Sequence, residues 1–234
     1  MSPLPLTGER TVPGIAREQY WFARHEAVYE WLAPRCTGAT ILEAGSGEGY
    51  GADLLRQAGA RVVALDYDEQ TITHSARTYP LPHVRGNLAA LPVGRVDALV
   101  SLQVIEHLWD LRGFLREVRR VADWTCLSTP NRLTFSPGLS RGRKPTNPFH
   151  VEEFDAEQLR DLMRDAGFRD VMILGLQHGA RLAQRPTLIA EQIDAALSGH
   201  WPAELETFVA GVTTADFTMT ADLDTCLDLV VLAS

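Results

Sequence analysis

The sequence predicts an α/β fold in which helices cover a mostly parallel sheet. Short apolar runs alternate with stretches of helical periodicity along the chain, which is the pattern of repeated strand–helix–strand units. A glycine-rich turn at residues 45–51 follows the first central run and leads directly into a helix. The chain has 234 residues, of which 45% are hydrophobic, and this is enough for the core of one domain, residues 1–234, with insertions.

The amino-terminal part of the chain predicts an arm and a cap helix within residues 1–35. Residues 1–15 contain three prolines and two glycines and should be extended. Residues 16–32 show helical periodicity, with Tyr20 and Trp31 on one apolar stripe. Proline removes a backbone donor, so Pro34 is expected to end this helix.

The glycine-rich turn is the strongest signal of ligand binding. Residues 40–44 predict a buried strand, residues 52–58 a helix, and Gly59 stands where a C-cap glycine belongs. Glycines at positions 45, 47, 49 and 51 would leave backbone bare, so a ligand could lie against it beside a helix N-terminus. A structural turn without a ligand is the alternative.

Two cofactors compete for this turn. The pattern Gly47-x-Gly49-x-x-Ala52 fits the dinucleotide fingerprint only loosely. The pattern Glu43-x-Gly45-x-Gly47-x-Gly49 resembles motif I of class I S-adenosylmethionine methyltransferases. A carboxylate at the turn is tolerable beside a cationic cofactor, whereas it would repel a pyrophosphate. The turn therefore favours S-adenosylmethionine.

Polar residues follow several of the other predicted strands. Asp66 lies 21 residues beyond Gly45, the spacing at which an acidic side chain meets ribose hydroxyls in such folds. Its alternative role is the N-cap of the next helix, which Asp68 could fill instead. Asn87 stands where methyltransferases often place an aspartate near the adenine, and its side-chain oxygen can still accept a hydrogen bond. The further predicted strands are residues 61–65, 83–86, 96–100, 124–129 (stopped by Pro130), 171–176 and 226–232.

The segment from Gln103 to Asp110 follows a central strand. Asp110 is expected to cap a helix over residues 111–121, which has one apolar stripe. Glu106 and His107 should therefore lie at the carboxyl end of the strand. Open α/β sheets bind their ligands at that edge.

The first insertion, residues 131–153, is too long for an ordinary strand-to-helix loop. It is rich in proline and glycine and ends in the segment Asn147-Pro-Phe-His150. We expect a lid that closes over the acceptor. The basic run at residues 141–144 is interpreted as a solvated loop.

A helix and a second insertion follow. Asp155 should cap the helix, with Gln158 three residues later completing a capping box. Residues 177–223 form the second insertion, with helical segments near 186–198 and 202–212.

Composition excludes several classes of protein. The chain carries 22 Lys and Arg residues against 30 Asp and Glu residues, a net charge of −8, which argues against a nucleic-acid partner. Three scattered cysteines do not form a disulfide framework or a zinc site. Neither a signal peptide nor an apolar run long enough for a membrane span is present. The expected setting is soluble, reducing and cytoplasmic, and the sequence does not indicate an oligomeric state.

The order of elements resembles the class I methyltransferase fold, a Rossmann-like seven-stranded sheet whose antiparallel last strand lies between strands five and six. Over nearly its whole length the chain is also similar to mycobacterial and actinobacterial methyltransferases linked to methylglucose lipopolysaccharide biosynthesis. That resemblance implies methyl transfer to a sugar hydroxyl, namely the 6-hydroxyl of glucose units in an α-glucan. The segments that carry it are residues 8–14, 20–25, 103–110, 128–132, 147–150, 178–181 and 212–217.

Motif I, the strand ends and the resemblance together give a set of predicted site residues. The predicted cofactor contacts are Glu43, Gly45, Ser46, Gly47, Gly49, Asp66, Tyr67, Asn87, Leu88 and Gln103. The predicted contacts with a sugar or oligosaccharide acceptor are Arg24, His25, Asn131, Arg132, His178 and Arg181.

His107, His150 and Glu106 are the predicted catalytic residues. A sugar hydroxyl becomes a better nucleophile as it loses its proton, and a base within reach contributes ~10²–10⁴-fold. His107 is the favoured base because a rigid strand fixes it, whereas His150 depends on closure of the lid. Glu106 would then orient the imidazole.

Other mechanisms and functions stay open at this point. Glu106 and His107 resemble part of a Glu-x-x-Glu-His segment that binds a divalent ion in quinone O-methyltransferases, but Gln103 replaces the first glutamate, so a Mg²⁺ site there would lose a charge. The acceptor could be a phenol or quinone instead of a sugar. A non-catalytic subunit that binds S-adenosylmethionine is a further alternative, while an NAD-dependent oxidoreductase lacks the expected Tyr-x-x-x-Lys pattern.

Overall fold

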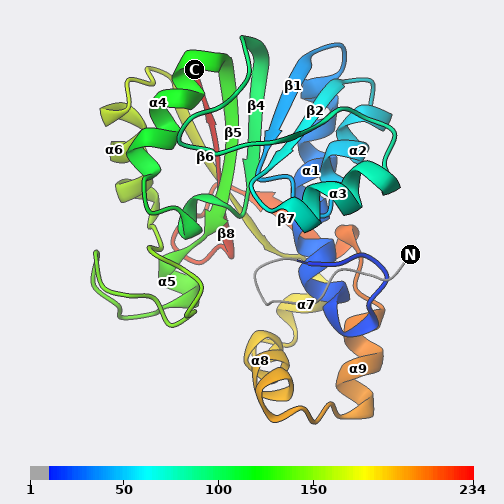
Figure 1. Cartoon of the computed structure of the whole chain (residues 1–234). Coiled ribbons are helices and arrows are strands. Elements are labelled where there is room, and N and C mark those ends of the chain that lie inside the picture. The colour runs from blue at the N-terminus through cyan, green and yellow to red at the C-terminus, as the bar shows by residue number, and fades with distance from the viewer. Residues whose placement is uncertain (1–10) are drawn as a thin grey trace.

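The computed structural model describes residues 11–234, and its central feature is one eight-stranded sheet. The first ten residues of the predicted arm lie outside this range. The strands are β1 Thr40–Ala44, β2 Arg61–Asp66, β3 His83–Arg85, β4 Val96–Leu102, β5 Ala122–Pro130, β6 Val171–His178, β7 Phe217–Thr220 and β8 Asp228–Ala233. Their order in the sheet is β3-β2-β1-β4-β5-β8-β6-β7 (Figure 1).

Helices cover both faces of this sheet (Figure 1). One apolar core joins the sheet to α1 and α2, and a second core joins it to α4 and α6. The helices are η1 Ala16–Glu18, α1 Gln19–Cys36, α2 Tyr50–Gln57, α3 Glu69–Thr78, η2 Ile105–His107, α4 Leu111–Val121, α5 Arg132–Phe135, α6 Ala156–Asp165, α7 Ala180–Ala183, α8 Leu188–Ser198, α9 Ala203–Ala210 and η3 Thr214–Asp216.

The central strands are buried on both sides, which explains their continuous apolar runs. In β1, Ile41 belongs to the first core and Leu42 to the second, and both side chains are 0% exposed. Successive strand residues point to opposite faces, so a strand covered on both faces is largely apolar, and the buried Glu43 is the exception in β1. The apolar character of β1 therefore places it in the middle of the sheet.

The predicted position of the last strand is confirmed, and the predicted number of strands is wrong. β8 pairs antiparallel with both β5 and β6, as expected for the strand between them. The additional strand is β7, which pairs antiparallel with β6 at the edge of the sheet. Its four residues are too few to show a periodicity that would distinguish a strand within the second insertion.

Two details of the predicted helices are also corrected. Pro34 does not end α1, which continues to Cys36. Pro34 lacks the donor for a bond to the carbonyl four residues earlier, and the helix ends within two residues of it. Asp155 caps α6 by accepting from the Gln158 amide nitrogen, but the Gln158 side chain donates to Glu152 and does not complete a capping box.

The insertions gather at one end of the sheet. β8 is antiparallel to the parallel strands, so its carboxyl end, at the chain terminus, marks the end of the sheet where the parallel strands begin. α5 and α7–α9 lie at the other end, where the parallel strands have their carboxyl ends (Figure 1). The two predicted helical segments of the second insertion correspond to α8 and α9. Among the described helices, none is long and apolar enough to cross a membrane. Cys36, Cys126 and Cys226 are free and buried.

Candidate active site

The glycine turn lies between β1 and α2 and contacts the end of β4. Gly45 has a φ of +80°, and a Cβ built on it would lie 2.7 Å from Cγ2 of Val104, so only glycine fits there. Gly47 also has a positive φ, of +52°, but a Cβ on it would meet nothing within 4 Å. The turn therefore closes tightly against the β4 side and leaves bare backbone open at Gly47.

Asp66, at the end of β2, lies beside this turn. Its Oδ2 accepts from the Gly47 amide nitrogen at 2.8 Å, and its Oδ1 accepts from the Asp68 nitrogen at 2.9 Å. The N-cap of α3 is Asp68, which accepts from the Thr71 nitrogen. Capping therefore does not explain Asp66, whose carboxylate lies beside the open backbone of Gly47, and its contact with a cofactor stays a prediction.

The predicted adenine-side residues lie on neighbouring segments. Tyr67 follows Asp66 and is 71% exposed, so its ring is available to a ligand. Asn87 follows β3, and its side-chain oxygen accepts from the Ala89 nitrogen at 2.9 Å. That bond forms a local turn and uses one of the two lone pairs of this oxygen, so contact with adenine stays a prediction. Leu88 is partly buried against the second core.

Glu43 lies within the protein and not on an open surface. Its carboxyl is 1% exposed and accepts from the Tyr29 hydroxyl of α1. Burial raises the pKa of Glu43 to about 8, and the nearby Asp66 carboxylate adds to this, while the Tyr29 hydroxyl opposes it. Contact between Glu43 and a cofactor stays a prediction, and its partner Tyr29 was not foreseen.

These features fit S-adenosylmethionine at the turn. Gly47 offers open backbone, Asp66 offers a carboxylate beside it, and the Ser46 hydroxyl is buried without a hydrogen-bond partner among the described residues. A cationic amino-acid ligand could use all three groups, since it carries both donors and acceptors.

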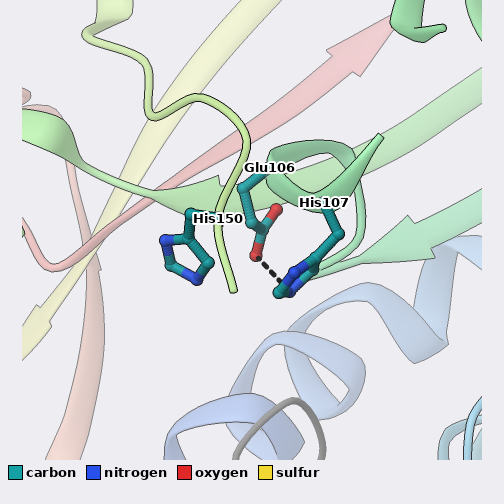
Figure 2. Close-up of side chains that lie close together, drawn as sticks. All are labelled: Glu106, His107 and His150. Carbon is teal, nitrogen blue, oxygen red and sulfur yellow. Dashed lines mark ion pairs between the residues drawn. The ribbon is translucent and has the colours of Figure 1, made fainter. Parts of the chain in front are cut away.

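Three polar side chains converge next to the turn, at the carboxyl end of β4. Glu106 and His107 lie on η2, and His150 comes from the first insertion (Figure 2). One ligand atom from each lies within 4.8 Å of the others, and the two imidazole rings are 5.0 Å apart. The sequence predicted both histidines as catalytic residues, and the structure brings them together.

A backbone carbonyl orients His107. Its Nδ1 lies 3.0 Å from the oxygen of Phe149, and because a carbonyl only accepts, Nδ1 must donate. In the neutral ring Nε2 therefore carries the lone pair. Nε2 lies 3.9 Å from Oε1 of Glu106 (Figure 2).

His150 is held at both ring nitrogens. The Asn147 side-chain oxygen accepts from the Phe149 amide nitrogen, so the Asn147 amide group faces His150 and donates to its Nε2 at 3.0 Å. Nδ1 must then carry the proton, which it donates to Glu153 at 2.6 Å. Sequence reasoning missed Glu153, which is 2% exposed.

Glu106 is 1% exposed, and burial raises the pKa of its carboxyl to about 8. The Thr129 hydroxyl donates to it at 3.0 Å, and the Val151 nitrogen donates to its backbone oxygen at 2.7 Å. The insertion is thus bonded directly to η2.

Gln103 does not join this cluster. Its side-chain amide donates to the Ser128 hydroxyl and to Asp228, each at 3.2 Å. Its φ of +56° is uncommon for a residue other than glycine, and such strain is concentrated at functional sites. The geometry therefore does not support a metal ion shared by Gln103 and Glu106. The side chain that lies beside Glu106 is that of His150 and not that of Gln103.

Arg24 and Asp228 form a buried ion pair, and Asp228 is the residue that accepts from the Gln103 side chain. Arg24 is 7% exposed and Asp228 1% exposed, and Nε of Arg24 donates to Asp228 at 2.8 Å. The pair joins α1 to β8. Asp228 was missed, and its only signal was a carboxylate at the start of the apolar run 229–232.

The other predicted acceptor residues have partners within the protein, and their contact with an acceptor stays a prediction. His25 bonds the Tyr50 hydroxyl, His178 bonds the Tyr20 hydroxyl, Asn131 donates to Leu223 and Cys226, Arg132 pairs with Asp155, and Arg181 pairs with Asp216.

Comparison with known proteins adds sequence relatives. Residues 42–123 match the family described as a methyltransferase domain. A Mycobacterium tuberculosis protein named a probable S-adenosylmethionine-dependent methyltransferase is 49% identical over 247 aligned positions, which cover 98% of this chain and 89% of that protein. A protein of Mycolicibacterium smegmatis with the same description is 48% identical, with 99% and 95% covered. A ubiquinone biosynthesis O-methyltransferase of Methylocella silvestris is 30% identical over 57% of this chain and 48% of its own length.

Solved structures share the fold. An S-adenosylmethionine-dependent methyltransferase of Thermotoga maritima superposes with a TM-score of 0.64 at 15% identity, covering 93% of this chain and 90% of that one. The magnesium protoporphyrin IX methyltransferase of Synechocystis, with S-adenosylhomocysteine bound, gives 0.58 at 16% identity, covering 96% and 89%.

Proposed function

This chain belongs to the S-adenosylmethionine-dependent methyltransferases, and from that premise we propose that it methylates a sugar hydroxyl. The acceptor we infer is a glucose unit of an α-glucan, such as a methylglucose lipopolysaccharide precursor, methylated on its 6-hydroxyl. The observation that carries the proposal is the cluster of Glu106, His107 and His150 beside the glycine turn.

The turn and the cluster are close because of one packing contact. Gly45 lies against Val104, and η2, which carries Glu106 and His107, begins at the next residue. A ligand on the glycine turn and an acceptor at the cluster would therefore be neighbours. Holding the two reactants in line supplies much of the rate in such a reaction.

S-adenosylmethionine, when bound, supplies an activated methyl group. The residues of the chain then have separate tasks. Gly47 and Asp66 would hold the cofactor, and the cluster would hold the acceptor hydroxyl. Neutral His107 would accept the hydroxyl proton on Nε2. The neighbouring Glu106 would favour the imidazolium only when ionised, above its raised pKa of about 8.

A polar insertion supports a sugar acceptor. Residues 140–144, Ser-Arg-Gly-Arg-Lys, are all exposed, and the insertion is bonded to η2 through Val151. A glycan needs polar groups around its hydroxyls, whereas a phenol is bound best by a compact apolar pocket.

A phenol or quinone acceptor is the second candidate. It is supported by the partial match to a relative named for ubiquinone biosynthesis, which also suggests transfer to oxygen.

Transfer of labelled methyl from S-adenosylmethionine to a panel of acceptors tests both candidates. The panel comprises short α-glucans, glucosylglycerate and catechols. Label on a sugar, released as a 6-O-methyl hexose after hydrolysis, is the expected result. Label only on catechols would replace the first candidate with the second, and label on no member of the panel would contradict both.

A further inference from the structure

The cluster of Glu106, His107 and His150 has a property that proton transfer alone does not require. Both imidazoles have their Nδ1 proton held by an acceptor, His107 by the Phe149 carbonyl and His150 by the Glu153 carboxylate. Both rings therefore carry the lone pair on Nε2, and one ligand atom of each ring lies within 4.8 Å of the other ring's and of a Glu106 oxygen. A histidine that binds a metal is almost always held in this way by a carboxylate or a carbonyl on its other nitrogen.

We propose that Glu106, His107 and His150 form a binding site for a divalent transition-metal ion such as Zn²⁺, and that an ion bound there inhibits methyl transfer. Metal binding is independent of the proposed function, whereas the inhibition rests on it.

The donor set selects the class of ion. Two imidazoles and one carboxylate are the protein ligands of open zinc sites, and imidazole also suits cobalt and nickel. Mg²⁺ prefers oxygen ligands and keeps its waters, so it should bind this set poorly. The site therefore differs from a magnesium site made of carboxylates.

The geometry requires a small contraction. Zinc lies about 2.0–2.2 Å from nitrogen and oxygen ligands in a tetrahedral arrangement, so two ligand atoms should lie about 3.3–3.6 Å apart. The three groups now lie within 4.8 Å of one another, and His150 accepts from the Asn147 amide. An ion would displace that amide, and the flexible side chains could then close the remaining gap.

Inhibition follows from the use of one lone pair. If the Nε2 lone pair of His107 is bound to a metal ion, it cannot accept the proton of the acceptor. Metal occupancy and the proposed role of His107 therefore exclude each other.

Metal binding is tested on the full chain after removal of metals with a chelator. Zn²⁺ binding is measured by calorimetry, and Co²⁺ binding by its visible absorption, with Mg²⁺ for comparison. We expect one Zn²⁺ per chain, affinity at least tenfold weaker in His150→Ala, and Glu153→Gln weaker by about 10–100-fold. Asn147→Ala loses the competing donor, so it should bind at least as tightly as the parent. His200→Ala, an exposed histidine elsewhere, is the matched control.

Failure of the metal-free protein to bind Zn²⁺ or Co²⁺, or equal affinity in His150→Ala and the parent, would overturn the site. Zn²⁺ should also lower methyl transfer by the parent, with recovery on chelation. Metal-free enzyme that is inactive until Zn²⁺ is added would overturn the inhibition. If the metal-free enzyme transfers methyl to a sugar but no ion binds, the inference fails and the proposed function stands.

Discussion

The Nδ1 atom of His107 donates to the carbonyl oxygen of Phe149 at 3.0 Å, and this bond links the end of β4 to the first insertion. The candidate base is thus oriented by the insertion that we expect to act as a lid. The Val151 nitrogen, bonded to the backbone oxygen of Glu106, makes a second link of the same kind. Closure of the insertion and orientation of the base are therefore coupled.

Hydrogen exchange should detect this coupling. Residues 137–149 should exchange more slowly when S-adenosylhomocysteine and a sugar acceptor are both bound, because closure excludes water from the site. Residues 188–198 of α8 provide a control segment within the second insertion. Equal exchange of residues 137–149 with and without both ligands would count against a lid.

Asp66 should be needed for cofactor binding. Asp66→Ala removes a charged acceptor beside Gly47, and hydrogen bonds to charged groups contribute about 1.5–3 kcal/mol, so affinity for S-adenosylhomocysteine should fall by roughly tenfold or more. Calorimetry gives the affinity. In the control, Asp68→Ala, loss of the α3 cap should lower stability by about 0.5–2 kcal/mol and affect binding less. Unchanged binding in Asp66→Ala would show that its carboxylate does not contact the cofactor.

Glu43 should make stability depend on pH. Burial raises its pKa from 4.5 to about 8, so between these values the folded protein holds a proton that the unfolded chain releases. The free energy of unfolding from this group therefore falls as pH rises through that range.

The variant Glu43→Gln keeps an acceptor for the Tyr29 hydroxyl without a charge. Its melting temperature relative to the parent should rise between pH 5 and pH 9, as measured by thermal unfolding without cofactor. Glu30→Gln, at an exposed position of α1, is the control and should show no such trend. A constant difference between Glu43→Gln and the parent over this range would refute the raised pKa.

The Arg24–Asp228 ion pair should be costly to break. Asp228→Ala leaves a buried guanidinium without its partner, and such changes cost about 3–5 kcal/mol. The exposed pair of Arg17 and Glu206, with side chains 50% and 38% exposed, is the matched control, and Arg17→Ala should cost less than about 1 kcal/mol from the lost pair. Urea denaturation measures both. Equal losses in the two variants would mean that burial does not set the cost.

Local signals in the sequence predicted the central fold well. The strand of residues 40–44 and the cap Asp110 are confirmed, because periodicity and caps depend on nearby residues. The place of the last strand, which the resemblance to the class I methyltransferase fold implied, is also confirmed. β7 was missed because four residues at a sheet edge have no pattern of their own.

The site was predicted less completely, because its details depend on contacts between distant segments. Strand ends correctly placed Glu106 and His107 at one edge of the sheet. The bonds of His150 with Asn147 and Glu153 depend on how the insertion folds, and periodicity does not describe an irregular loop. The Arg24–Asp228 pair joins residues 204 positions apart, so no local pattern could reveal it.

The rate of a single turnover by His107→Ala at saturating S-adenosylmethionine tests most directly whether His107 accepts the acceptor proton. His107→Ala and the parent are compared with the same sugar acceptor, without divalent ions, over a range of pH. The variant should be slower than the parent by ~10²-fold or more across this range. A variant rate within about threefold of the parent, far below the effect of a base, would contradict the account.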